Sequence, residues 1–270
     1  MKLLRVFPRR TPLTPTDDLA FVGDPPLWRP KADKVHVSCC FTWDKPEAER
    51  LADSWSRFYP VDIGGPAYKT PAKDFTPGLY LKEGVTITSR GCPRKCPWCV
   101  VPEIEGKTKE LPILPGNIVQ DNNLLACSME HVERVFYMLA GQRRISFPGG
   151  LDARLLQPWH VSMLKFLRVF ELWFAADADY WAALRRASLL LHEFKRNKKR
   201  CYVLIGYNGE DIGAAEERLE MVWGLGFLPF AQFYRGPGEQ KKTKEWATLV
   251  RQWTRPAIMK ARMNETTGGK

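Results

Sequence analysis

Hydrophobic residues recur with the periods of strands and helices along most of this chain. From Gly84 onward, short apolar runs alternate with longer segments whose apolar residues return every three or four positions. The predicted strands are 84–89, 117–121, 144–148, 171–175, 201–206 and 227–233. The predicted helices are 128–141, 158–168, 179–196, 211–225 and 241–255. Strands that alternate with helices predict a parallel sheet with helices on its outer side.

The helix over 128–141 has the clearest pattern. Ser128 can cap its N-terminus, and Val132, Val135 and Leu139 share one apolar face. The connection 92–116 has no convincing helix, because a cysteine-containing loop and a Pro/Gly-rich stretch occupy it. Six strands are too few for a closed eight-stranded barrel. We therefore expect an α/β fold, an open (βα)6 partial TIM barrel.

The first 80 residues follow a different pattern. Residues 1–30 contain six prolines, which predicts an extended arm without regular structure. Apolar residues then alternate over Val35–Trp43 as in a strand, a helix begins at Pro46, and 60–65 resembles a second strand. This is a small N-terminal βαβ extension. The predicted parts of the chain are 1–80, a core over 81–236, and a basic C-terminal helix or tail over 237–270.

Composition adds a charge signal to this picture. The 270 residues contain 41 Lys and Arg against 30 Asp and Glu, a net charge of +11. Such an excess suits an anionic partner, although solubility alone explains it equally well. No apolar run approaches the ~18–20 residues of a membrane-spanning helix, so we expect no membrane partner. Seven cysteines, with no charged-then-apolar signal segment at the start of the sequence, indicate a reducing, cytoplasmic location.

Three of the cysteines lie close together, in Gly91-Cys-Pro-Arg-Lys-Cys-Pro-Trp-Cys99. Thiolates at the spacing of Cys92, Cys96 and Cys99 can bind three irons of a 4Fe-4S cluster and leave the fourth iron open. Electron-transfer clusters ordinarily use four cysteines, so the missing ligand suggests that the open iron binds another molecule. The segment therefore predicts a metal centre with a vacant position.

Zinc is the main alternative metal. A structural zinc site closes with four nitrogen or sulfur ligands, but this segment supplies three and all four histidines are distant in the sequence. A disulfide with a spare thiol would suit a secreted protein. We therefore favour the cluster, and keep a zinc-stabilised, non-catalytic nucleic-acid-binding module as the alternative.

The cysteine spacing, and its position after the first core strand, resemble the radical S-adenosylmethionine (SAM) superfamily. The resemblance covers roughly 84–235. It implies that the open iron binds SAM, and that an external one-electron reductant such as a flavodoxin or ferredoxin supplies an electron. It also implies that the resulting 5'-deoxyadenosyl radical abstracts hydrogen from a substrate. A regulator that binds SAM at such a cluster without cleaving it is a second alternative.

The segment 35–68 is similar to the truncated end of the cobalamin-binding-like domain that precedes many radical SAM cores. A working domain of that kind is a full doubly wound unit with an Asp-x-His-x-x-Gly loop. Here one βαβ unit is predicted, and the sequence contains no such motif. We therefore expect a vestige that supports the barrel and binds no cobalamin.

The resemblance also implies SAM contacts at the ends of the predicted strands. Asp121 and Asn122 stand where the family binds the SAM amino group, although the usual Gly-Gly-Glu signature is absent. Asp152 and Asp177 are candidates for the ribose hydroxyls, and Arg154 for the SAM carboxylate. Either aspartate could instead cap a helix.

The adenine of SAM has three further predicted neighbours. Trp98 occupies the position at which the family commonly has an aromatic residue against the adenine, although ordinary packing would also explain it. Gly206 fits the family's fifth-strand glycine motif, which lets the backbone approach the adenine. Tyr207 could line the same pocket.

The C-terminal part of the chain suggests a substrate. Residues 238–270 carry eight Lys and Arg against three Glu, a net charge of 8 − 3 = +5. Lys241, Lys242 and Lys244 begin this part just after the last predicted strand, at the end of the sheet where the cysteine loop is expected. They could follow a phosphate backbone. We therefore expect a nucleic acid, RNA or DNA, as the substrate in preference to a small metabolite or a peptide, with a solubilising tail as the alternative.

Overall fold

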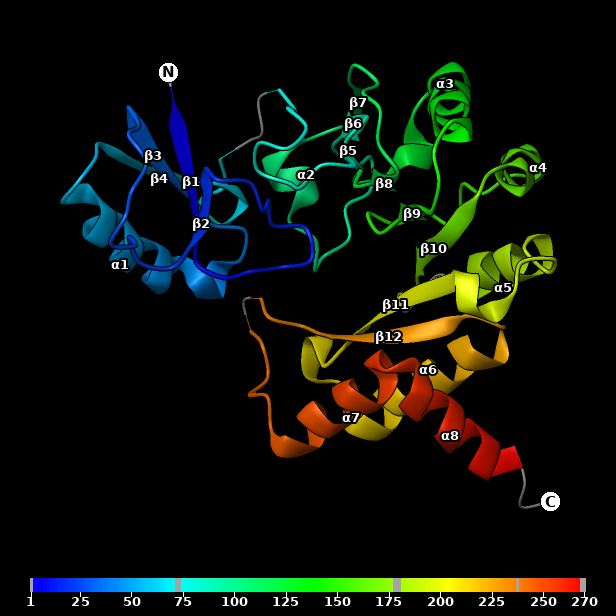
Figure 1. The fold of residues 1–270 in the computed structure, drawn as a ribbon. Coiled ribbons are helices and arrows are strands. Elements are labelled where there is room, and N and C mark those ends of the chain that lie inside the picture. Colours follow the sequence, from blue (N-terminus) through cyan, green and yellow to red (C-terminus); the bar gives the residue numbers. More distant parts are fainter. Residues whose placement is uncertain (1, 71–73, 177–180, 237, 268–270) are drawn as a thin grey trace.

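The computed structural model describes residues 2–70, 74–176, 181–236 and 238–267, and its strands form three sheets. Figure 1 shows the N-terminal sheet on one side of the molecule and the larger sheet with its helices on the other. Strand order in the four-stranded sheet is β2-β1-β3-β4, and in the six-stranded sheet it is β12-β11-β10-β9-β8-β5. The third sheet is the small pair β6-β7. The protein is thus a mixed α/β structure built on parallel strands.

The N-terminal sheet confirms the predicted βαβ unit and extends it by two strands. Its strands all pair in parallel, and β3 is connected to β4 through helix α1. Leu4, Val35 and Trp55 are fully buried in the core between this sheet and α1. The elements are β1 (Leu3–Phe7), β2 (Ala20–Val22), β3 (Lys34–Ser38), α1 (Lys45–Ser56) and β4 (Val61–Gly64).

Two N-terminal predictions need correction. The expectation that 1–30 lacks regular structure is wrong for β1 and β2, because the apolar run Leu3–Phe7 ends before the first proline and forms a central strand. The predicted strand over Val35–Trp43 ends at Ser38. Its last part turns into a short 3-10 helix, η1 (Thr42–Asp44), which leaves Trp43 exposed to solvent.

The six-stranded sheet confirms all six predicted core strands, with shorter bounds for the first three. Each described pair of neighbouring strands is parallel, and the strands follow one another in chain order. The strands are β5 (Val85–Thr86), β8 (Ile118–Val119), β9 (Ile145–Phe147), β10 (Val169–Ala175), β11 (Lys199–Ile205) and β12 (Leu228–Phe233).

The predicted core helices also occur, and Figure 1 shows them following the strands around the outside of the sheet. The predicted helix at 179–196 is described from Trp181 and ends at Leu190; residues 179–180 lie outside the described part. Two helices, instead of one, follow β12. The helices are α3 (Met129–Ala140), α4 (Pro158–Phe166), α5 (Trp181–Leu190), α6 (Ile212–Gly224), α7 (Lys244–Thr254) and α8 (Pro256–Thr267).

The two faces of the larger sheet differ in character because side chains alternate along each strand. Phe174 and Val203 point to the helix side, where they join the main buried core. On the other face, Trp173 stacks on Tyr202 with ring centroids 4.5 Å apart, and Phe230 lies 5.7 Å from Tyr202. The helix-free face therefore carries an aromatic surface.

The connection after β5 contains small elements that the sequence did not reveal. Strand β6 (Ser89–Arg90) pairs antiparallel with β7 (Lys109–Glu110), and the short helix α2 (Val101–Ile104) lies between them. The β6-β7 pair closes the base of the loop that carries the three cysteines. Within the described ranges, no helix has the length and apolar content needed to cross a membrane.

Candidate functional site

The cysteine loop begins at a turn that only glycine fits well. Gly91 has a φ of 79°, and a Cβ atom there would lie 2.2 Å from the carbonyl oxygen of Lys107. The Cys92 amide donates to the carbonyl of Gly106 over 3.1 Å, which joins the two sides of the loop. Asn122 accepts a 2.9 Å hydrogen bond from the Gly91 amide through its side-chain oxygen. Asn122, predicted as a SAM contact, thus binds the start of the loop.

Asp121 is a buried residue that binds Thr88 and Ser89, just before the cysteine loop. Only 1% of the residue is exposed. One carboxylate oxygen accepts from the Thr88 amide at 2.7 Å, and the other accepts from the hydroxyls of Thr88 and Ser89 at 2.6 and 2.8 Å. Burial raises the pKa of Asp121 although these hydrogen bonds oppose the shift. Both oxygens of the predicted SAM ligand are therefore engaged within the protein.

Asp152 links the cysteine loop to the third strand of the sheet. Its carboxylate binds the Arg154 side chain at 2.6 Å and 2.8 Å, and Arg94 of the cysteine loop approaches it at 3.4 Å. Burial alone would raise the pKa of Asp152, but the hydrogen bonds and charge of Arg154, with a contribution from Asn123, hold it below the ordinary value. The structure thus pairs two predicted SAM contacts with each other.

Asn123 is a residue of this site that the sequence analysis passed over. Its side-chain amide donates to the sulfur of Cys92 at 3.5 Å and to Asp152 at 3.2 Å. The residue is 4% exposed, and its Oδ1 atom is buried without a hydrogen-bond partner in the described structure. Its position after the predicted Asp121-Asn122 pair was the only available signal, because three polar residues in a row carry no periodicity.

The three cysteines fit a metal centre by donor chemistry, although their side chains do not yet form one. Cys92 and Cys96 are half-buried and Cys99 is exposed, and all are reduced. Among the described residues, no group of three or more His, Cys, Asp or Glu side chains is arranged to hold a metal ion. Three thiols on one short loop supply the donors of an iron–sulfur site, and metal binding commonly completes the geometry of such loops.

Two cysteines outside the loop have the properties of core thiols. Burial raises the pKa of the Cys127 thiol to about 11. Burial also raises the pKa of Cys39, which is 0% exposed. Since metals bind the thiolate, a raised pKa disfavours both as ligands.

An aromatic row connects the cysteine loop to the ends of β11 and β12. The ring of Trp98 meets that of Tyr207 edge-on at 5.4 Å, and Tyr207 meets Tyr234 at 5.0 Å. Trp98 and Tyr207 were both predicted to line the pocket of the SAM adenine. The structure brings them into contact, so they can form two walls of one pocket.

Gly206 lies at the end of β11 in the left-handed region, with a φ of 74°. A Cβ atom at this position would approach the Phe233 ring to 2.8 Å. The Gly206 amide donates to Glu210 at 2.9 Å, and Glu210 in turn forms an ion pair with Arg218. This turn is therefore specified by both backbone conformation and space. Asp177, the remaining predicted ribose contact, lies outside the described residues.

Comparison of the chain with protein-family models and with curated proteins found no match. What the cysteine loop can do chemically therefore follows from its own residues and their neighbours.

Proposed function

We propose that this chain is a radical SAM enzyme. Cys92, Cys96 and Cys99 bind three irons of a 4Fe-4S cluster, and SAM binds the fourth. The observation that carries the proposal is a three-cysteine loop that follows the first strand of a six-stranded parallel sheet. Four-ligand zinc chemistry and electron-transfer clusters both need one more ligand than this loop provides.

The strand order supports an open (βα)6 partial barrel. Doubly wound sheets reverse their strand order at a switch point, whereas barrel strands follow one another in sequence. The described strands of the larger sheet run in chain order without reversal. The helix-free aromatic face of Trp173, Tyr202 and Phe230 would then line the interior of the barrel.

When bound, the cluster and SAM would supply a 5'-deoxyadenosyl radical and methionine by reductive cleavage of SAM, with one electron from an external flavodoxin- or ferredoxin-like donor. The chain's own residues bind and orient the cofactors and exclude water. Trp98 and Tyr207 contact the adenine, and Gly206 lets the backbone approach it. Asn123 donates to the sulfur of Cys92 and stabilises its negative charge.

The polar residues around the loop take roles that differ from simple SAM contacts. Asp121 and Asn122 stabilise the strand and turn before Cys92, through hydrogen bonds to Thr88, Ser89 and Gly91. Asp152 orients Arg154, whose guanidinium is a candidate for the SAM carboxylate. The N-terminal sheet is proposed as a vestige that binds no cobalamin.

The test is anaerobic purification or reconstitution followed by metal and sulfide analysis. We expect about four irons and four sulfides per chain, and loss of both when Cys92, Cys96 or Cys99 is replaced individually by Ala. Cys127→Ala and Cys39→Ala are matched controls that should keep the cluster, because both cysteines lie outside the loop and burial raises the pKa of their thiols. Reduced protein should convert SAM into 5'-deoxyadenosine and methionine.

Two outcomes would contradict the proposal. Stoichiometric zinc without acid-labile sulfide in anaerobic preparations would indicate the non-catalytic zinc module. A cluster that binds SAM but releases no 5'-deoxyadenosine, with any reductant, would indicate a regulator instead of an enzyme.

A further inference from the structure

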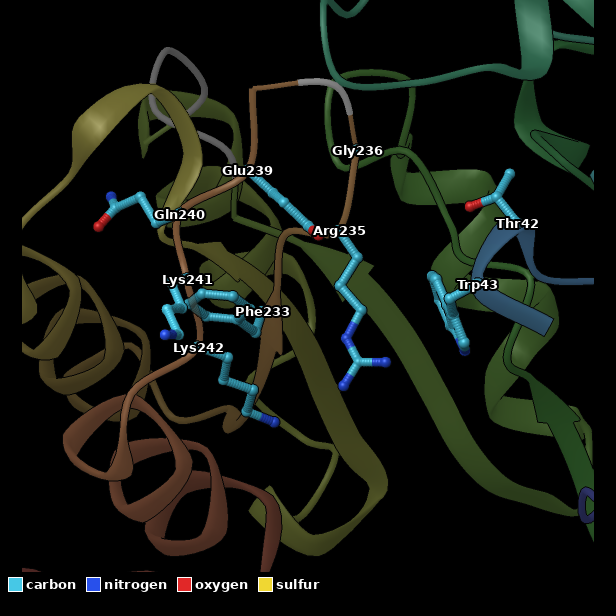
Figure 2. Close-up of a pocket in the computed structure, with 9 residues that line it drawn as sticks. All are labelled: Thr42, Trp43, Phe233, Arg235, Gly236, Glu239, Gln240, Lys241 and Lys242. Carbon is cyan, nitrogen blue, oxygen red and sulfur yellow. The ribbon is translucent and has the colours of Figure 1, made fainter. Parts of the chain in front are cut away.

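A cleft lies between the N-terminal sheet and the end of β12. It has a volume of about 810 Å³, and we call it the cationic cleft (Figure 2). Thr42 and Trp43 come from the short helix η1, and the other lining residues come from the end of β12 and the segment after it. The lining residues are Thr42, Trp43, Phe233, Arg235, Gly236, Glu239, Gln240, Lys241 and Lys242.

The charge of the lining suits an anionic ligand. The lining contains three cationic side chains and one carboxylate, that of Glu239. The cations are Arg235, Lys241 and Lys242. Figure 2 shows the Arg235 side chain between Trp43 and the segment that carries the two lysines. All three cationic residues are exposed, so they can reach phosphate groups with a smaller desolvation penalty than buried charges would pay.

The same cleft offers flat aromatic surfaces. Trp43 is 42% exposed and stacks on Phe41, which is 36% exposed, with ring centroids 4.8 Å apart and an interplanar angle of 12°. The Arg235 guanidinium lies 4.8 Å from the centroid of the Trp43 ring. A nucleobase can replace this guanidinium on the ring, and Arg235 can then bind the adjacent phosphate.

Hydrogen bonds and ring contacts connect the cleft to the proposed SAM site. The side chain of Gln240, a lining residue, donates to the carbonyl oxygens of Gly206 at 3.3 Å and Glu210 at 2.8 Å. Tyr234, next to Arg235, contacts Tyr207, which contacts Trp98 of the cysteine loop. A polymer in the cleft would therefore pass beside the place where the radical is formed.

We propose that the cationic cleft binds single-stranded nucleic acid, the substrate class of the proposed radical SAM reaction, on which this inference rests. Non-specific single-strand binding sites combine basic grooves for the backbone with aromatic rings for unstacked bases. The cleft carries both. An acidic peptide would use the cations, but it would gain nothing from the exposed Phe41–Trp43 stack.

The experiment measures binding by fluorescence anisotropy with labelled single-stranded RNA and DNA oligonucleotides, using anaerobic protein that retains its metal centre. Trp43→Ala should weaken binding about 5- to 160-fold, since one base–aromatic stack contributes about 1–3 kcal/mol. Trp43→Phe should retain most of the affinity, because it keeps a ring in place. Phe58→Ala is the matched control, since Phe58 is an exposed ring under Arg29 outside the cleft.

Salt dependence tests the phosphate contacts. Lys241→Ala combined with Lys242→Ala should reduce the slope of log affinity against log salt by about 1.4, because each phosphate contact on a single strand contributes about 0.7. A double change at Lys195 and Lys260, which are exposed and lie outside the cleft, removes the same charge and should leave the slope nearly unchanged.

Three results would overturn the proposal: no binding at low salt, equal effects of the cleft and control variants, or equal competition by a polyglutamate peptide. Iron and sulfide content and SAM cleavage are measured on the same preparations. Failure of nucleic-acid binding with an active cluster would refute the substrate class alone. Loss of the cluster in all preparations would instead refute the proposed function.

Discussion

Asp121 should be required for folding through its hydrogen bonds more than through its charge. Thr88 and Ser89 are 0% exposed, so water cannot replace the carboxylate as acceptor. Asp121→Ala removes the acceptor of the Thr88 amide, and an unsatisfied buried amide costs about 1–3 kcal/mol. The hydroxyls of Thr88 and Ser89 can rotate toward other acceptors, so they add less to the loss of stability. We expect a loss of about 2–3 kcal/mol in the free energy of unfolding.

Asp121→Asn separates hydrogen bonding from charge. The amide oxygen can accept from the Thr88 amide, and the NH2 group can donate to the two hydroxyls. This variant should remain within about 1 kcal/mol of wild type. The two variants should therefore differ by about 1–3 kcal/mol, which at roughly 2–4 °C per kcal/mol is a Tm difference of about 2–12 °C. Asp53→Ala, at an exposed position on α1, is the control for removal of a carboxylate.

The pH dependence gives a second readout. Because burial raises the pKa of Asp121, its contribution to stability is complete below the pKa of the unfolded chain and is lost as pH rises through the folded pKa. The stability of Asp121→Asn relative to wild type should therefore increase as pH rises above about 4. Urea unfolding between acidic and neutral pH measures this difference. Equal Tm values for the Ala and Asn variants, or a pH-independent difference, would refute the reasoning.

Three further predictions concern other positions. Gly206→Ala should lower the free energy of unfolding by about 1–3 kcal/mol and weaken SAM binding, because the left-handed φ is strained for alanine and the new Cβ would meet Phe233 at 2.8 Å. Calorimetric titration with SAM checks this, and an unchanged affinity would contradict it. Asn123→Ala should lower the reduction potential of the cluster by about 40 mV, because it removes one hydrogen bond of about 1 kcal/mol to the Cys92 sulfur. An EPR-monitored redox titration measures this shift, and a raised potential would contradict the role given to Asn123. Burial lowers the pKa of His160 to about 4. The free energy of unfolding should therefore fall by on the order of 3 kcal/mol as the pH drops from about 6.5 to about 4. Urea titrations of His160→Gln should not show this loss.

The core strands could be predicted because glycine, proline or charged residues border their apolar runs, so each run has recognisable ends. Strand β1 could not, since the six prolines of 1–30 outweighed its five residues. The β6-β7 pair was equally hidden, because neither Ser89–Arg90 nor Lys109–Glu110 contains an apolar residue. Local patterns thus identified the regular core and missed the short elements that close the cysteine loop.

The candidate site likewise contains residues that could be predicted from the sequence and contacts that could not. The positions of Asp121 and Asp152 after strands could be read from the sequence. Their partners could not, because Thr88 lies 33 residues before Asp121 and Arg94 lies 58 before Asp152. Side-chain hydrogen bonds across such separations depend on the folded sheet. Trp98 and Tyr207 were assigned to one pocket through a family resemblance, and their contact in the structure is an independent geometric result.

The chain order of the larger sheet has a consequence for synthesis on the ribosome. Each described strand of that sheet after β5 pairs with the strand of the sheet that comes before it along the chain. The sheet can therefore grow as successive segments emerge. The contact between Trp43 and Arg235 is different, since it joins an early segment to one of the last. We expect a nascent chain that stops before β12 to contain most of its folded sheet and yet no cationic cleft. Synthesis of β12 and the segment after it would then be the step that creates the binding surface.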